Sequence, residues 1–280
     1  MSPFTLQQKV FTLSWLSNNA MGKIGRAAPL EARIVTSIHA ELANPLITSH
    51  IGDWQIIWGP VIFESTGPLG RPSDVADNTM VAFKGTDGGK PVVVVAIAGT
   101  NYLSLFGIGR EDIVGPTPVP FSGTAWIAAG THRGVSILET MKDPGGRGAL
   151  QPFLESQAST GTTLVFTGHS LGGALSPSLA LDLAVNKHFD LTRWAKVYVY
   201  PTAGPTPGNQ AFSDLFAKTF PSVPPTDSTH FNAWNMDISN SLDIVPRAWA
   251  ALSTLPSLYA QPGEIGVVNA VQTIVDNLTT

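Results

Sequence analysis

The pentapeptide Gly168-His169-Ser170-Leu171-Gly172 is the stretch that most constrains how this chain can fold. An apolar run at 164–166 precedes it, and leucines then recur at every fourth position from 171 to 183. The run predicts a buried strand, and the four-residue spacing predicts a helix. Glycines on both sides of the serine let two backbones pass closely. The sequence therefore predicts a strand, a sharp elbow at Ser170 and a helix.

This context favours a nucleophilic serine over a plain glycine-rich phosphate-binding turn. The G-x-S-x-G pattern alone is weak evidence, because 27 glycines in 280 residues make chance matches common. A phosphate-binding loop is disfavoured because no lysine follows the glycines. On the strained turn the Ser170 hydroxyl would stand clear of the sheet, as an attacking group must.

Length and composition predict one domain over residues 1–280, because 43% hydrophobic residues can fill one large core. A net charge of −4 with 13% charged residues leaves no basic stripe, so no nucleic-acid partner is expected. The absence of cysteine excludes disulfides and thiolate sites. No apolar run is long enough for a membrane span, and no transmembrane anchor is expected. The N-terminus lacks a signal peptide, which leaves a secreted chain without its leader or a cytoplasmic one.

Hydrophobic spacing along the chain predicts an α/β fold. Two amphipathic helices open the chain, and a hairpin of two strands leads into an alternation of helices and strands, which implies parallel pairing. We therefore expect a mostly parallel central sheet with an antiparallel lead-in and helices on both faces. The expected helices are 5–17, 29–43, from 132 to 141, around 150–154, after 170, 210–216, 249–259 and 265–278. The expected strands are 54–63 (broken at 59–60), 80–84, 91–98, 163–167, 197–200 and 230–236.

The segment 102–130 holds no hydrophobic period for long, yet it is rich in apolar side chains between glycines and prolines. A long apolar loop inside a compact domain is usually functional. We expect a lid or acyl-chain wall, with a packed surface loop as the alternative. The expected pocket residues are Phe106, Ile108, Phe121 and Trp126.

Three sequence islands together resemble the class 3 lipases, a branch of the α/β-hydrolases. They are Ala98-Gly99-Thr100 at a strand end, Gly168-His-Ser-Leu-Gly-Gly173, and Asn240-x-x-Asp243-x-Val245-Pro246. Gly204-Pro205 with Gly208-Asn209, and the weaker His132-x-Gly134, extend the likeness. The five islands span residues 79–250, and their combination is more specific than any single motif.

The resemblance implies a catalytic triad with Ser170 as nucleophile and Asp243 as acid. It implies an oxyanion hole formed by the backbone N–H groups of Thr100 and Leu171. A serine needs a base to take its proton, and a carboxylate holds the resulting imidazolium. Asp237 is a rival acid, but no Val-Pro follows it.

A triad histidine is missing from the expected place. The family has it downstream of the acid, whereas all six histidines of this chain, at 39, 50, 132, 169, 188 and 230, precede Asp243. We expect the base to come from a C-terminal piece beyond these residues, with His132 as the internal alternative. His169 should pack beside the elbow, with its side chain directed away from that of the serine.

The leading hypothesis is a serine hydrolase of carboxylic esters, a lipase or esterase acting on triacylglycerol or other lipid-like esters. Its substrate could lie at an oil–water interface, and it needs no metal or organic cofactor. The alternative is a non-catalytic lipid- or ester-binding module that kept the elbow and lost its base. Reaction with a fluorophosphonate separates the two, because only an activated serine is labelled quickly.

Overall fold

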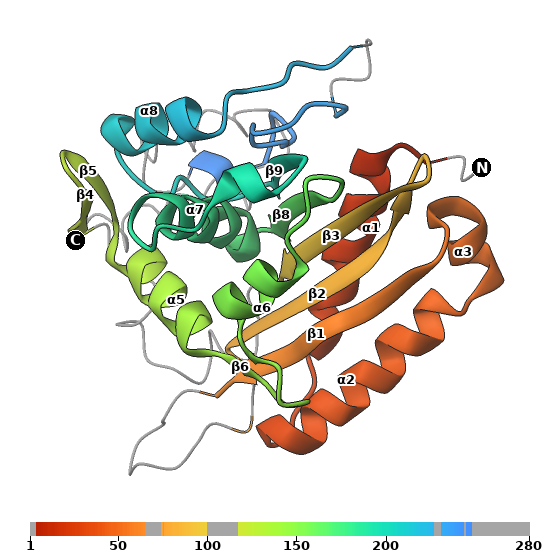
Figure 1. Cartoon of the computed structure of the whole chain (residues 1–280). Helices are drawn as coiled ribbons and strands as arrows, with labels where there is room; N and C mark the ends of the chain where they lie inside the picture. Colours follow the sequence, from red (N-terminus) through yellow and green to blue (C-terminus); the bar gives the residue numbers. More distant parts are fainter. Residues whose placement is uncertain are drawn as a thin grey trace, which may run out of the picture.

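The computed structural model describes residues 4–64, 74, 76–99, 117–226, 231–243 and 245–247. A five-stranded sheet lies at the centre, in the order β1-β2-β3-β8-β9 (Figure 1). Its strands are β1 Trp54–Phe63, β2 Asn78–Asp87, β3 Lys90–Ile97, β8 Thr163–His169 and β9 Lys196–Thr202. β1, β2 and β3 pair antiparallel, whereas β8 pairs in parallel with both β3 and β9. The expected antiparallel lead-in to a parallel region is confirmed.

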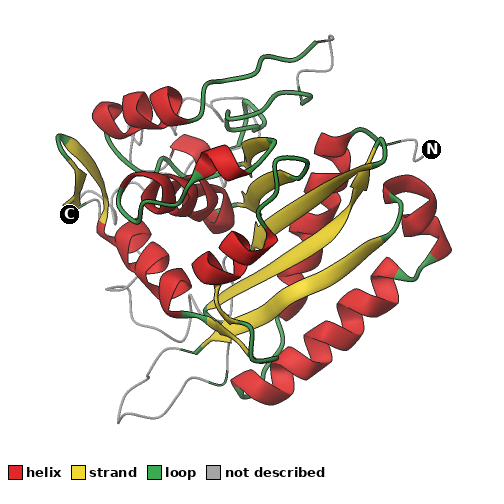
Figure 2. Ribbon diagram, viewed as in Figure 1, coloured by secondary structure: helices red, strands yellow, loops and turns green. Residues whose placement is uncertain are grey.

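Helices cover both faces of this sheet (Figure 2). They are α1 Leu6–Ser17, α2 Ala27–Leu42, α3 Pro45–Ile51, α5 Ala129–Thr140, α6 Leu150–Gln157, α7 Leu171–Val185 and α8 Gln210–Thr219. α1, α2 and α3 pack in one hydrophobic core, and α5, α6, α7 and α8 pack in the other. The expected α/β architecture with helices on both faces is therefore confirmed.

The central strand β3 explains why both faces must be covered. Val93, Val95 and Ile97 enter one core, and the alternate residues Val92, Val94 and Ala96 enter the other. Successive side chains of a strand point to opposite faces, so a run that is apolar at every position can be buried only between two layers. β3 is thus held as a rigid strand whose end meets the elbow.

Part of the expected lid is a small hairpin. Residues 102–116 lie outside the described residues, but β4 Pro118–Ser122 and β5 Ala125–Ala128 pair antiparallel around Gly123. α5 then begins at Ala129, earlier than expected, so that His132 lies inside the helix. Two short strands with a turn between them are too brief to show as a period in the sequence.

β1 covers the expected span 54–63, and its pairing with β2 shifts register between Trp58 and Val61, where the break was expected. The expected strand at 230–236 was wrong. The described residues 231–236 form no strand; Trp234 makes one antiparallel bridge with Val223, and the parallel bridge to β9 comes later, from Ile238 to Thr202. Asn235 explains this, because its φ is +60° and its side-chain oxygen accepts from the N–H of Val199 at 2.8 Å. The side-chain oxygen thus takes the place of a backbone carbonyl, while the backbone N–H of Asn235 still donates to the carbonyl of Val199 at 2.8 Å.

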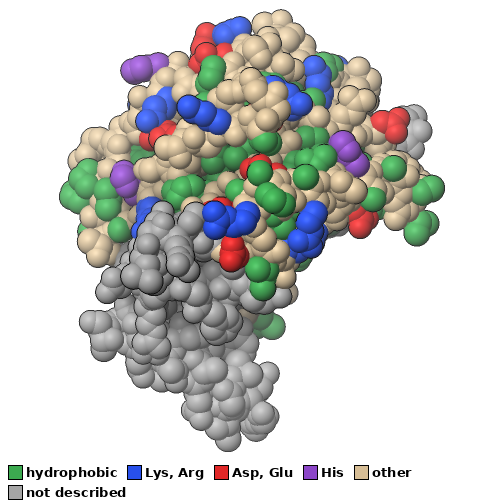
Figure 3. Space-filling view, turned by 90° about the horizontal axis from the view of Figure 1, so that it is seen from below, with side chains coloured by type: hydrophobic (Ala, Val, Ile, Leu, Met, Phe, Trp, Pro, Cys, Tyr) green, Lys and Arg blue, Asp and Glu red, His purple; other side chains and the backbone are tan. Residues whose placement is uncertain are grey.

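Two shorter strands, β6 Lys142–Asp143 and β7 Gly148–Ala149, form a separate hairpin beside β1. The buried carboxylate of Asp143 accepts from the N–H groups of Gly59 at 2.7 Å and Arg147 at 3.1 Å. On the face shown in Figure 3, basic and acidic side chains are scattered in small groups among hydrophobic and other side chains. No helix in the described part of the chain is long and apolar enough to cross a membrane.

Candidate active site

Ser170 occupies the predicted elbow between β8 and α7. It is the N-cap of α7 and has φ +58° and ψ −122°, a backbone conformation that residues other than glycine rarely adopt. Such backbone strain persists only where the surrounding structure imposes it, and it concentrates at functional sites. The N–H of Ser170 donates to the carbonyl of Thr202 at 3.0 Å, which fixes the elbow to the end of β9.

Close backbone contacts explain the glycines around the serine. A Cβ on Gly168 would overlap the backbone of Gly172, and a Cβ on Gly172 would overlap the carbonyl of Ile97. A Cβ on Gly173 would lie 2.7 Å from the Cα of Gly204. No side chain fits at these places, so the elbow can form only with glycine there.

Leu171 is the first residue of α7. The N–H groups of a helix's first turn have no acceptor within the helix, and they carry the positive end of its dipole. The N–H of Leu171 is therefore suited to stabilise an oxyanion beside Ser170. The other expected donor, Thr100, lies outside the described residues, but Gly99 before it is buried against the elbow.

His169 lies beside the elbow, as expected. Its ring stacks on that of Trp15 with a centroid separation of 5.1 Å, and its Nδ1 lies 3.2 Å from the hydroxyl of Thr202. Burial lowers the pKa of His169, and the negative charge of Asp243 opposes this effect. Asp243 is thus near enough to the elbow for its negative charge to affect the pKa of His169.

Asp243 lies in a turn that its own side chain stabilises. Its Oδ1 accepts from the N–H of Val245 at 2.9 Å, and its N–H donates to the carbonyl of Asn240 at 2.9 Å. The carbonyl of Pro246 then accepts from the hydroxyl of Thr206 at 3.1 Å, which ties this acid-bearing turn to the loop after β9. The carboxylate is half-buried on this turn.

Asp237 is a second carboxylate close to Asp243. Burial raises the pKa of Asp237 to about 6; hydrogen bonds from the N–H of Gly204 and from Ser239 oppose this, and the charge of Asp243 adds to it. The Gly204 bond measures 3.2 Å. Gly204 in turn contacts Gly173 of α7, so Asp237 supports the backbone on which α7 rests. Asp237 therefore has a structural role, as the acceptor for the backbone N–H of Gly204.

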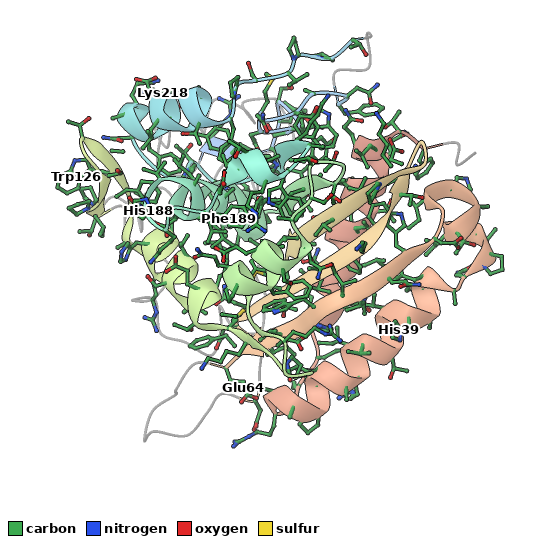
Figure 4. The ribbon with its side chains drawn as sticks, in the orientation of Figure 1. His39, Glu64, Trp126, His188, Phe189 and Lys218 are labelled. Atoms are coloured by element: carbon green, nitrogen blue, oxygen red, sulfur yellow. The ribbon has the colours of Figure 1, made fainter. Side chains whose placement is uncertain are left out.

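The other described histidines are exposed and lie on other elements. His39 is on α2, His50 on α3, and His188 in the loop after α7; Figure 4 labels His39 and His188. His132 lies on the exposed side of α5, whose buried side, including Gly134 and Val135, faces the opposite way. Among the hydrogen bonds of the described residues, none joins an imidazole to the Ser170 hydroxyl. The structure does not bring His132 to Ser170.

Two of the expected pocket residues belong to the hairpin β4–β5. Trp126 lies at the edge of the molecule (Figure 4) and lines a cavity of about 470 Å³ between this hairpin and residues 206–213. Phe121 packs edge-on against Phe212 at 5.2 Å between ring centroids. The side-chain oxygen of Asn209 accepts from the N–H groups of Trp126 and Phe212, both at 3.0 Å, and joins hairpin to helix. Phe106 and Ile108 lie outside the described residues.

Sequence reasoning missed the part played by α1. Trp15 and Asn18, at the end of this helix, both contact the site: Trp15 touches the His169 ring, and Asn18 binds the backbone of Gly99. The hydrophobic spacing at 5–17 predicts an amphipathic helix in which Trp15 is one more apolar residue. Its exposed fraction of 49% distinguishes it from the buried Leu13 and Leu16, but only the structure shows this.

Within the described ranges, no three His, Asp or Glu side chains gather in a way that could hold a metal ion. The expectation that no cofactor is needed stays a prediction. The chemistry available among the described residues is that of a serine hydroxyl, helix N–H groups and two carboxylates.

Part of the chain matches a known protein family. Residues 129–252 match the family model of lipase (class 3). Phospholipase A1-II 3 of Oryza sativa subsp. indica is 26% identical over 189 residues, which are 61% of this chain and 40% of that protein. The alignment thus spans well under two thirds of the relative's length.

Solved structures share the fold. M37 lipase superposes with a TM-score of 0.72 at 25% identity, over 96% of this chain and 79% of that one. A lipase from Rhizopus microsporus var. chinensis superposes with a TM-score of 0.52 at 18% identity, over 88% and 71%. The mixed sheet with helices on both faces is that of an α/β-hydrolase, and residues 129–252 are similar to the class 3 lipases.

Proposed function

We propose that this protein is a serine hydrolase of lipid-like carboxylic esters that forms an acyl-enzyme on Ser170. The observation that carries the proposal is the left-handed backbone of Ser170 at the start of α7. This geometry presents the hydroxyl outside the sheet, and it makes the N–H of Leu171 available beside it. The match of residues 129–252 to the class 3 lipase model supports the general class of lipid ester hydrolase.

In the proposed reaction the Ser170 oxygen adds to the ester carbonyl carbon while a base removes the serine proton. The N–H of Leu171, together with that of Thr100, stabilises the tetrahedral oxyanion, and each such donor contributes about 3 to 4 kcal/mol. The intermediate collapses to an acyl-serine as the alcohol leaves with the proton, and water then releases the acid. Asp243 supports the base as it becomes charged.

The base itself stays a prediction. The histidine expected downstream of the acid is not among the described residues. His132 remains the internal alternative, although it would have to move from its exposed position. Asp243 is favoured over Asp237 as the acid because Asp237 is engaged with the backbone of Gly204.

The expected substrates are acylglycerols or other lipid esters. The relatives' names include both lipase and phospholipase A1, so the ester class is chosen by the pocket and not by the elbow. Phe121 and Trp126 provide aromatic surface on one side of α7, the helix that follows the elbow. Whether the segment 102–116 forms a lid stays a prediction, and a rise in activity above the solubility limit of the ester is its expected sign.

A fluorophosphonate probe tests the proposal directly. The wild-type chain should be labelled on Ser170, as located by peptide mass. Ser170→Ala should abolish both labelling and ester hydrolysis, whereas the matched control Ser49→Ala, at an exposed position of α3, should retain both. Hydrolysis that persists after Ser170→Ala would remove this serine from the mechanism.

The second candidate function is a lipid- or ester-binding module without catalysis. It is favoured by one observation, the absence of a hydrogen bond from any described histidine to Ser170. A wild-type chain that binds a non-hydrolysable ester but is not labelled by the probe would support this function and refute the first.

A further inference from the structure

The C-terminal end of α1 lies against the elbow from the side of the sheet opposite to α7. α1 belongs to the hydrophobic core that faces away from α7, and in Figure 1 it lies behind the strands. Its position is fixed near its other end by Lys9, whose buried ammonium lies 2.6 Å from Asp87 in β2. The helix is therefore a rigid support for whatever its last residues contact.

Asn18, the C-cap of α1, makes the central contact. Its side-chain oxygen accepts from the N–H of Gly99 at 2.7 Å. Its backbone N–H donates to Leu16 and Trp15, and its side-chain NH₂ lies 3.4 Å from the carbonyl of Ser14. The helix end thus holds the amide with its oxygen directed at Gly99.

Gly99 is a buried residue two positions after the end of β3, where the sheet no longer pairs its N–H. A buried N–H without a partner is costly, so Asn18 supplies what the sheet does not. A Cβ built on Gly99 would lie 2.9 Å from the carbonyl of His169 and 3.5 Å from the Cβ of Ser170. The Gly99 peptide is therefore packed directly on the nucleophile elbow.

Trp15 makes a second contact from the same helix end. Its ring stacks on His169, the residue before the nucleophile, with an angle of 27° between the planes. Asn18 and Trp15 lie three positions apart, and hence on neighbouring parts of the helix surface. Asn18 binds the backbone just after β3, and Trp15 covers the elbow.

We propose that Asn18 is a positioning residue for ester hydrolysis, which sets the separation between the Gly99 peptide and Ser170. The inference rests on the proposed function, because it deepens the description of that site. Gly99 directly precedes Thr100, the expected second oxyanion donor. A displacement of this strand end would weaken oxyanion stabilisation while leaving ester binding nearly unchanged, because the oxyanion exists only after attack.

The test compares Asn18→Leu with Asn19→Leu on a soluble p-nitrophenyl butyrate substrate. Asn19 is the matched control, because its amide bonds Leu16 and Ser37 of the described residues, away from the elbow. Asn18→Leu should lower kcat about 10- to 100-fold with KM changed less than twofold, since small misplacements have effects of this size. Asn19→Leu should lose a similar amount of melting temperature without this loss of kcat.

Asn18→Asp keeps an acceptor for the Gly99 N–H and should recover part of the kcat lost in Asn18→Leu. Should Asn18→Leu fail to melt cooperatively, Asn18→Ala carries the same comparison without added bulk. Equal loss of kcat in the Asn18 and Asn19 variants, a change in KM alone, or no recovery with aspartate would overturn the inference. A wild-type chain that neither hydrolyses the ester nor takes the fluorophosphonate would instead refute the proposed function, so the two failures are distinct.

Discussion

Replacing Ser170 by glycine should stabilise the protein relative to replacing it by alanine, although both variants should be inactive. Alanine keeps the Cβ that makes φ +58° and ψ −122° unfavourable, whereas glycine adopts positive φ freely. Relief of such strain is worth about 1 to 3 kcal/mol. The greater chain entropy of glycine costs about 0.5 to 1 kcal/mol. The difference in favour of glycine should lie between about 0 and 2.5 kcal/mol, and the middle of each range gives about 1 kcal/mol.

Thermal unfolding of the two variants measures this difference. A gain of 1 kcal/mol raises the melting temperature of a chain of this size by about 2 to 4 °C. Ser213, exposed within α8, provides the control pair, because glycine in an ordinary helix should be the less stable variant by about 0.5 to 1 kcal/mol. If Ser170→Gly melts at or below Ser170→Ala, the elbow is not strained and the argument from its backbone fails.

Two further predictions concern carboxylates. Asp243→Asn should lower kcat about 10⁴-fold if this acid orients the base, while Asp237→Asn should do little; steady-state kinetics with the reverse ranking would move the acid to Asp237. Burial and the neighbouring Asp182 raise the pKa of Glu139 to about 7, against the opposing effect of Lys187. The folded state therefore binds a proton more tightly than the unfolded chain does, and this site loses stability as the pH rises from about 4.5 through 7. Glu139→Gln should gain melting temperature relative to wild type across that interval, and parallel curves for the two proteins would contradict the assignment.

Much of the fold could be predicted from the sequence because its signals are local. The apolar run of β3, buried on both faces, indicated a central strand, and the spacing of leucines after Ser170 indicated α7. The elbow could be predicted because its glycines are demanded by backbone contacts that no other residue permits. The hairpin β4–β5 and the failed strand at 231–236 could not, because short pairings and the side-chain bond of Asn235 leave no period in the sequence.

The sequence by itself therefore determined most of the longer helices and strands and the glycine elbow at Ser170, since each depends on neighbours within a few positions. Only the tertiary structure decided what surrounds the elbow. Asn18 and Gly99 are 81 positions apart, and Trp15 is still farther from His169, yet both pairs are in contact. The tertiary structure also places His132 on the exposed side of α5, whereas the sequence analysis had considered it as an internal base for Ser170. Such contacts arise because α1 and the elbow are both packed against the same sheet. Packing between distant segments leaves no local pattern in the sequence.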